Sequence, residues 1–311
     1  MSETVSIVGA GRVGRALGRR LRELGWRIGA VTARSSATAR AAVRAIGAGQ
    51  PAAAPDYRVL ASRVILIATP DSAIAGVAAD LAKFGGKEWS GKIVLHTSGT
   101  LDSSVLRPLS ALGAATGSMH PMQTFSSQNV PDLSRCIFGI EGSPVALQGA
   151  RKIIHEMGGV AVRLSGADKA AYHAAGSFAC VYVLAVMEAA TRLLMTQGFK
   201  RRQAMRALLP LARQTLDNFE SVGPLAAWTG PLARTDFPVV ERHAKALAEF
   251  QPVYLEAYKT LSHLTAEMLA GKPPAMRKEL DKIFEAASTP RKNRREMKEE
   301  PERKSKVAQI I

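Results

Sequence analysis

The segment VSIVGAGRVGRAL, at residues 5–17, limits the possible folds of this chain more than any other segment. A short apolar run leads into glycines with the G-x-G-x-x-G spacing, and a helical pattern follows them. In such a turn Gly9 permits the sharp bend, Gly11 lets the backbone approach a pyrophosphate, and Gly14 lets the helix pack on the strand. The N–H groups at the start of the helix attract the phosphates. We therefore predict a dinucleotide-binding loop whose contact residues are Gly9, Gly11, Arg12, Val13 and Gly14.

The end of the second predicted strand bears on which dinucleotide binds. The chain reads VTARSS there, with no carboxylate for the ribose 2′-hydroxyl of NAD. Arg34, Ser35 and Ser36 could instead hold a 2′-phosphate through charge and hydrogen bonds. The alternative is that Ser35 caps the next helix and Arg34 is only solvated. We expect NADP(H) in preference to NAD, with Thr69 and Pro70 beside the nicotinamide at the end of a buried strand.

Apolar runs and helical patterns alternate along the first half of the chain. With 311 residues, 47% of them hydrophobic, the chain is long enough for two domains. The alternation predicts an α/β domain, a doubly wound, mostly parallel sheet of the Rossmann type. We expect strands over 4–8, 26–31, 63–68, 92–96, 114–119, 136–142 and 160–164, and helices over 12–25, 35–48, 71–85 and 144–158.

Helical periodicity without strand patterns begins after Leu164. We therefore divide the chain into a dinucleotide-binding domain at 1–164, an all-helical substrate and dimerisation domain at 165–286, and a basic tail at 287–311. The tail segment PRKNRREMKEEPERKSKVAQII holds eight basic and four acidic residues without apolar periodicity, which is typical of disorder.

The charge balance of the chain is basic, with a formal net charge of +16. Such an excess suits anionic small molecules, nucleic acid or acidic membranes. Aromatic residues make up only 5%, and no basic stretch alternates with stacking rings, so we do not expect nucleic-acid binding as the main function. Cys136 and Cys180 form neither a disulfide framework nor a metal-ligand cluster, so we expect no metal. The N-terminus lacks signal-peptide features, which favours a cytoplasmic protein.

The stretch DKAAYHAAGSFACVYVLAVMEAA admits three interpretations: a membrane span, a buried core helix or the wall of an active site. Its apolar run is about a minimal span in length and carries polar side chains, so we expect no membrane helix. Ser165 and Asp168 have the spacing of a capping box, which predicts a helix start here. Lys169, His173 and Ser177 then share one face, with the lysine near the first turn, where the helix dipole disfavours a cation. That placement favours an active site; a core histidine is the alternative.

A family resemblance rests on the start of this helix. A Rossmann domain followed by a helix that begins Gly166-x-x-Lys169 resembles the 6-phosphogluconate and β-hydroxyacid dehydrogenase superfamily. The resemblance implies that Lys169 is the general acid/base of a hydride-transfer step. It also implies that the loop HTSGT, at 96–100, binds substrate. The superfamily usually has an asparagine one turn after the lysine, and this chain has His173 there.

A closer resemblance extends over nearly the whole chain except the tail. The motifs HTSG, HPMQTF, KAAYHAAGSFA, GPLAR and VVERHAKAL together resemble a family that pairs a Rossmann-like domain with a helical domain of unknown function. Members are described as deazaflavin-dependent NADP oxidoreductase-like, and some act as ketopantoate reductases. Two departures stand out. Thr235 occupies a position where members tend to have glycine, and Val181 one where many have asparagine.

These observations predict an NADPH-dependent reductase of a small, anionic 2-oxo acid, most specifically ketopantoate. The alternatives are a reductase of another small carbonyl or imine, and a non-catalytic NADP-binding sensor. We also expect a homodimer formed through the helical domain. His120 and Arg234 have plainer interpretations, as a rigid His-Pro turn and a surface arginine. The predicted catalytic residues are Lys169, His173 and Ser98, and the predicted substrate-binding residues are Thr97, Gly99, His120, Gln123, Ser177 and Arg234.

Overall fold

The computed structural model of the protein describes residues 3–126 and 131–288. The chain divides into two compact units, Met1–Leu184 and Ala185–Ile311. The sheet ends at Arg163, close to the boundary expected from the sequence at residue 164. The first unit extends further, through a turn and the helical residues that begin at Lys169, to Leu184. Most of the predicted basic tail, from residue 289 onward, lies outside the described residues.

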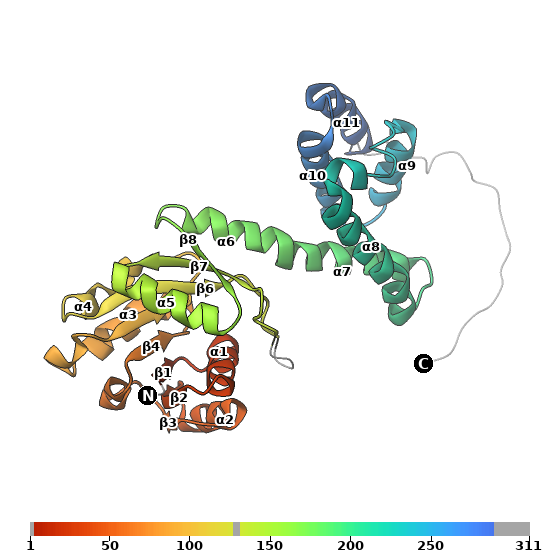
Figure 1. Ribbon diagram of the computed structural model, residues 1–311. Helices are drawn as coiled ribbons and strands as arrows, with labels where there is room; N and C mark the ends of the chain where they lie inside the picture. The colour runs from red at the N-terminus through yellow and green to blue at the C-terminus, as the bar shows by residue number, and fades with distance from the viewer. Residues whose placement is uncertain (1–2, 127–130, 289–311) are drawn as a thin grey trace, which may run out of the picture. The chain divides into compact units, whose positions relative to one another are not determined.

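Eight strands of the first unit form one sheet in the order β3-β2-β1-β4-β5-β6-β7-β8 (Figure 1). All neighbouring pairs are parallel except β6 and β7, which are antiparallel. The predicted Rossmann-type sheet is therefore confirmed, and β3 is the one strand that the sequence patterns missed. The strands are β1 (Thr4–Val8), β2 (Arg27–Thr32), β3 (Gln50–Ala52), β4 (Val64–Ile67), β5 (Ile93–His96), β6 (Ala115–Pro121), β7 (Ile137–Gly142) and β8 (Val160–Arg163).

Helices cover both faces of this sheet, because its central strands bury side chains on both sides. In β4, Val64 and Leu66 join the apolar core beneath α1 and α5. Ile65 and Ile67 join the opposite core beneath α3 and α4. The helical elements of this unit are α1 (Arg12–Glu23), α2 (Ser36–Ile46), η1 (Tyr57–Ala61), α3 (Asp71–Ala82), η2 (Gly86–Trp89), η3 (Ser103–Leu106), α4 (Arg107–Ser110), α5 (Pro144–Glu156), α6 (Lys169–Ser177) and the π-helical η4 (Phe178–Tyr182).

All the regular secondary structure in the described residues of the second unit is helical. Its core is formed by side chains of α9, α10 and α11, among them Val240, Leu255 and Phe284. Helix α8 is interrupted at Gly223, which has a φ of +78° and is followed by Pro224. Helix α7 begins at the end of the first unit and continues into the second. The helices are α7 (Val183–Thr196), α8 (Arg201–Ala227), α9 (Phe237–Leu247), α10 (Pro252–Leu269) and α11 (Pro273–Ser288).

The predicted capping box at the start of α6 is wrong. The Ser165 hydroxyl donates to the Asp168 carboxylate at 2.6 Å, and no backbone N–H of the helix receives a side-chain cap. Asp168 already has helical φ and ψ angles, whereas a capping residue needs an extended backbone to turn its side chain back. The helix therefore starts at Lys169, which places the lysine in its first turn.

The stretch Lys169–Thr196 combines α6, η4 and α7 and is apolar. Among the described residues it is the one helical stretch long and apolar enough, by length and composition alone, to cross a membrane. A single such helix is weak evidence for a span, since helices that cover one another inside soluble proteins have the same composition. Its apolar side chains are largely uncovered in the single chain; Phe178 is 59% exposed and Leu184 69%.

Candidate active site

The glycine-rich loop lies where the strand order of the sheet reverses. Strands β2 and β3 lie on one side of β1, and β4 to β8 lie on the other. The loops that follow β1 and β4 therefore diverge at the carboxyl edge of the sheet, where folds of this kind bind ligands. Gly9 follows β1 and Thr69 follows β4. The two residues are in contact, since a Cβ on Gly9 would lie 2.5 Å from Thr69 Cγ2.

The three glycines of the loop have the packing that a dinucleotide site requires. Gly9 has a φ of +90°, which other residues rarely adopt. A Cβ on Gly14 would lie 2.6 Å from the carbonyl oxygen of Gly9, so the first turn of α1 packs directly on the loop. A Cβ on Gly11 would meet nothing within 4 Å. The space in front of Gly11 is therefore open to a ligand.

Two further features of this loop suit a phosphate-containing cofactor. Helix α1 has no side-chain cap at Gly11, so the N–H groups of its first turn are free to bind an anion. The hydroxyl oxygen of Thr69 is buried and has no hydrogen-bond partner among the described residues. Such a group is costly unless a ligand or water satisfies it. The residues present therefore fit a dinucleotide. Arg12 and Val13 begin α1 and lie in the same loop.

The residues after β2 have separate roles in the structure. The Ser35 hydroxyl accepts from the Thr38 N–H at 3.2 Å and caps α2, as the plainer interpretation of Ser35 expected. Ser36 is the first residue of α2. Arg34 is exposed and makes no ion pair within the part of the chain that the structure describes. Its guanidinium is available to a 2′-phosphate, and this role stays a prediction.

Lys169 is the most unusual side chain of the first unit, because it is ionisable and fully buried. Its Nζ donates to the carbonyl oxygen of Ser98 at 3.1 Å and to Ser118 Oγ at 2.8 Å. Burial lowers the pKa of Lys169 below its usual range, and the carboxylates of Glu141, Asp102 and Asp71 oppose that shift. An ammonium has three N–H bonds, and the described residues supply two acceptors.

The loop after β5 is held in place from both sides. Asp71 accepts hydrogen bonds from Ser98 Oγ at 2.7 Å and from Thr100 Oγ1 at 2.6 Å. His96 accepts from the Ser98 N–H through Nδ1 at 3.2 Å, and its Nε2 bonds the Asp102 carbonyl at 3.1 Å. Burial lowers the pKa of His96 to about 4. Since Asp71 starts α3 just after Thr69, the cofactor loop and the predicted substrate loop are linked through one carboxylate.

Two histidines and a tyrosine lie next to this loop, on the side of Gly99. His120 and His173 have ring centroids 5.5 Å apart, and Tyr172 meets His120 at the same distance. A Cβ on Gly99 would lie 2.4 Å from His173 Cδ2 and 2.9 Å from His120 Nε2, so only glycine fits beneath the two imidazoles. The structure thus brings Lys169, Ser98, Gly99, His120 and His173 together within the first unit.

The remaining predicted substrate residues make local contacts. Thr97 is half-buried, and its backbone N–H donates to Ile67 O at 3.0 Å. Gln123 is exposed and accepts from the Thr124 N–H at 2.8 Å. Ser177 Oγ donates to His173 O at 3.3 Å along the helix. Arg234 is exposed and belongs to the second unit.

Three residues of the site were not among the predicted site residues. Asp71 is the first residue of α3, Ser118 lies inside β6, and Tyr172 follows Lys169 by three positions. The spacing of Lys169 and Tyr172 places both on one side of a helix, and this signal could have identified the tyrosine. No comparable sequence signal marks Ser118, because its role depends on the pairing of β5 with β6.

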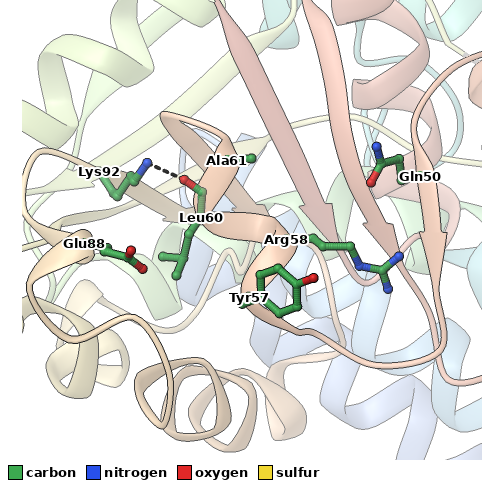
Figure 2. A pocket seen from close by; sticks show the side chains of 7 residues that line it. All are labelled: Gln50, Tyr57, Arg58, Leu60, Ala61, Glu88 and Lys92. Carbon is green, nitrogen blue, oxygen red and sulfur yellow. Dashed lines mark hydrogen bonds between the residues drawn. The ribbon is translucent and has the colours of Figure 1, made fainter.

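A separate pocket of about 470 Å³ opens on the first unit, away from these residues (Figure 2). It lies near the amino ends of β3 and β5, whereas the glycine-rich loop lies at the carboxyl edge. Lys92 donates to the Leu60 carbonyl there at 2.5 Å, and Arg58 pairs with Asp56. Its basic groups are thus already engaged. Its lining residues are Gln50, Tyr57, Arg58, Leu60, Ala61, Glu88 and Lys92.

Two family descriptions match different parts of the chain. Residues 2–121 match a Rossmann-like domain. Residues 136–265 match a domain of unknown function (DUF2520). The second match begins with the last two strands of the sheet and extends into the helices, so it includes Lys169 and Tyr172 but not the glycine-rich loop. No curated protein matches the sequence significantly.

Several solved structures share the fold of this chain. A candidate NADP oxidoreductase from Bacteroides fragilis has a TM-score of 0.71 at 21% identity, with 89% of this chain and 98% of that chain covered. A reductive aminase from Aspergillus terreus, in complex with NADPH and ethyl-5-oxohexanoate, has a TM-score of 0.64 at 19% identity, covering 89% and 99%. A pyrroline carboxylate reductase from Plasmodium falciparum with NADP bound has a TM-score of 0.54 at 13% identity, covering 92% and 100%.

Proposed function

We propose that this protein is an NADPH-dependent reductase of a small carbonyl compound. The observation that carries the proposal is the buried ammonium of Lys169, fixed beneath the Ser98 loop and connected through Asp71 to the loop after β4. That loop contacts Gly9 of the dinucleotide motif. The two structural neighbours named with NADPH or NADP bound are both reductases, which supports the same reaction class.

NADPH would be held by residues at the carboxyl edge of the sheet. The glycine-rich loop and the first turn of α1 suit the pyrophosphate, and Thr69 and Pro70 suit the nicotinamide side. Arg34, without an ion pair among the described residues, suits the 2′-phosphate. When bound, NADPH supplies a hydride to the carbonyl carbon of the substrate.

The role of Lys169 follows from its burial. Transfer of a hydride to the carbonyl carbon would move the π electron pair of the C=O bond to the oxygen, which would then take up a proton from solvent. A fixed positive charge near that oxygen stabilises it, and the effect is strong where water is excluded. Direct proton donation requires contact between the ammonium and the substrate. Because Lys169 is fully buried, its position favours stabilisation of the charge over direct donation.

The substrate class is the finer part of the proposal. The net charge of +16 suits an anionic substrate, and the family resemblance points to a 2-oxo acid, most specifically ketopantoate. The names of two structural neighbours, a reductive aminase and a pyrroline carboxylate reductase, favour an imine as the alternative. A non-catalytic NADP-binding sensor is the remaining alternative, because His173 occupies the position usually held by asparagine.

The test is NADPH oxidation, followed by absorbance, with ketopantoate and then with a panel of carbonyl compounds and cyclic imines. Saturable turnover that is weaker with NADH supports the cofactor and the reaction class together. The substrate with the highest kcat/KM decides between the carbonyl and the imine. Retained NADPH affinity without turnover on any of these compounds contradicts the proposal and favours the sensor.

The same proposal includes a homodimer and a cytoplasmic location. Apolar side chains of η4 and α7 are exposed in the single chain, and burial against a second copy would remove them from water. Cys136 and Cys180 are both free, which accords with a reducing compartment.

A further inference from the structure

Tyr172 lies at the centre of a small hydrogen-bond system that the proposed reaction does not yet use. Its hydroxyl oxygen accepts from the Gly139 N–H at 3.2 Å. The same oxygen lies 3.1 Å from His120 Nδ1 and 3.4 Å from the carbonyl oxygen of His120. Tyr172 comes from α6, His120 from β6 and Gly139 from β7, so the system joins the helix of Lys169 to the antiparallel end of the sheet.

Gly139 is required for this approach. A Cβ at that position would lie 2.8 Å from Tyr172 Cζ and 2.9 Å from its hydroxyl oxygen. Any side chain on Gly139 would therefore displace the ring. The phenol is half-buried, and burial raises the pKa of Tyr172, so the hydroxyl keeps its proton at neutral pH.

The distances show which acceptor receives the hydrogen bond from the Tyr172 hydroxyl. Gly139 already donates to the hydroxyl oxygen, so the oxygen has one proton of its own to give. An acceptor at 3.4 Å is beyond the usual range for an O–H donor, whereas the nitrogen at 3.1 Å is within reach. Tyr172 therefore donates to His120 Nδ1, which must be unprotonated to accept. The proton of a neutral His120 is then on Nε2.

The surroundings of His120 keep the imidazole neutral. The groups that face it are His173 and Lys169 on α6, His96 on β5 and Asp71 on α3. Burial, and next the neighbouring His173, lower the pKa of His120 to about 4. The only carboxylate in this set, that of Asp71, is already occupied by Ser98 and Thr100.

The Nε2 atom of His120 lies next to Gly99 in the Ser98 loop. A Cβ on Gly99 would lie 2.9 Å from it, so the absence of a side chain on Gly99 leaves Nε2 accessible. Nε2 has no hydrogen-bond partner among the described residues. It is also not among the side-chain atoms of those residues that are both buried and without a partner, so it is not closed off from solvent. Nε2 therefore lies beside the same loop whose carbonyl binds the buried Lys169.

We infer that Tyr172 is a positioning residue that holds His120 as the neutral Nε2–H tautomer, and that this N–H donates a hydrogen bond to the substrate oxygen. The inference rests on the proposed function for the identity of that oxygen, the carbonyl or carboxylate oxygen of a 2-oxo acid. The Nε2–H of His120 is then a hydrogen-bond donor that a ligand can reach. Lys169, buried under the Ser98 loop, contributes a positive charge to the site without touching the ligand. No proton leaves His120 in this role.

The tautomer is measured without reference to activity. The full chain, labelled with ¹⁵N at histidine, is studied by long-range ¹H–¹⁵N correlation at pH 7, with His120 assigned by a His120→Gln variant. We expect an unprotonated, hydrogen-bonded Nδ1 and a protonated Nε2. In Tyr172→Phe we expect the Nδ1 signal to move and His120 to protonate at a higher pH, because the donor to Nδ1 is lost. Tyr182→Phe, an exposed tyrosine of η4, is the matched control.

The roles of His120 and Tyr172 in the reaction are measured by steady-state kinetics with NADPH and the best carbonyl substrate. His120→Leu is expected to lower kcat/KM by about 100-fold, as for the loss of one donor to a developing oxyanion. NADPH affinity should not change. His120→Gln, which keeps an N–H, should recover part of the rate, and Tyr172→Phe should cost about tenfold through misplacement of the ring.

The outcomes separate this inference from the proposed function. A protonated Nδ1 in the wild type, or a Tyr172→Phe spectrum like that of the wild type, overturns the inference whatever the activity. An active wild type with an unchanged His120→Leu rate also overturns it and leaves the proposed function intact. A wild type without turnover contradicts the proposed function. The donor role is then judged with pantoate and NADP⁺ as the probe, and an Nε2–H signal that does not move overturns that role.

Discussion

The carbonyl oxygen of Ser98 accepts a hydrogen bond of 3.1 Å from the ammonium of Lys169, a residue 71 positions later in the chain. This bond fixes the first turn of α6 against the loop after β5. It also places a positive charge directly beneath that loop, at the edge of the sheet where the dinucleotide motif lies. The chemistry proposed for this protein depends on that contact.

Replacement of Lys169 by methionine tests the contact. The side chain keeps nearly the same volume and loses the charge, so we expect kcat for the carbonyl substrate to fall by about 100-fold or more. The dissociation constant for NADPH should stay within about twofold, since no cofactor contact is proposed for the lysine. Lys152→Met, at a half-exposed surface lysine, is the control. An unchanged turnover would remove Lys169 from the mechanism.

Cofactor selectivity is expected to depend on Arg34. A guanidinium that pairs with the 2′-phosphate contributes about 1.5–3 kcal/mol, so Arg34→Ala should raise KM for NADPH by roughly 10- to 100-fold. KM for NADH, which lacks that phosphate, should change little. Arg40→Ala, an exposed arginine on α2, serves as the control. Equal effects on both cofactors would show that Arg34 does not read the phosphate.

Stability should fall in mild acid because of His96. Its pKa is about 4 in the folded chain and about 6.5 in an unfolded one. The unfolded state therefore binds more protons in this range, and the free energy of unfolding decreases as the pH falls from about 6.5 to 4, by up to about 3 kcal/mol.

The measurement for His96 is urea unfolding at pH 7 and pH 4.5. A glutamine side chain at this position could accept from the Ser98 N–H and donate to the Asp102 carbonyl without titrating, so His96→Gln should reduce the loss of stability in acid. His120 also has a pKa of about 4 and retains its own share of the effect. His155→Gln, an exposed histidine of α5, should behave like the wild type. Equal acid sensitivity in His96→Gln would rule out this origin.

Thr235 has a φ of +53°, which is strained for a β-branched residue. The resembling family tends to have glycine at this position, and the backbone angle supplies a physical reason. Thr235→Gly should therefore stabilise the chain by about 1 kcal/mol, the strain relief exceeding the added freedom of the unfolded state. Thermal unfolding measures the change. Thr229→Gly, in the same loop but without a positive φ, should not stabilise.

The exposed apolar side chains of η4 and α7 lead us to expect a dimer that dissociates on dilution. Sedimentation of the full chain should show a dimer at micromolar concentration. Leu184→Glu, at a side chain 69% exposed in the single chain, should shift the dimer toward monomer by at least about tenfold in Kd. Tyr57→Glu, at an apolar side chain 73% exposed on η1, should leave the Kd unchanged. A monomeric wild type would contradict the dimer.

Much of the fold was predictable from local patterns. Buried parallel strands such as β4 need unbroken apolar runs, and a strand followed by G-x-G-x-x-G has few alternatives to the observed turn. The missed strand β3 has three residues, one of them Pro51, and so carries no such pattern. The predicted capping box failed because the two side chains bond each other, which depends on the backbone angles of Asp168.

The sequence by itself determined the strand–turn–helix unit, the order of the longer strands and helices of the sheet domain, and the shared helical face of Lys169 and His173, because periodicity and glycine spacing are local properties. Only the tertiary structure decided what those residues meet. Lys169 finds Ser98 and Ser118, and Tyr172 finds His120 and Gly139, because the sheet brings the ends of β5, β6 and β7 together. Contacts across such distances in sequence depend on strand order and register, which no local pattern encodes.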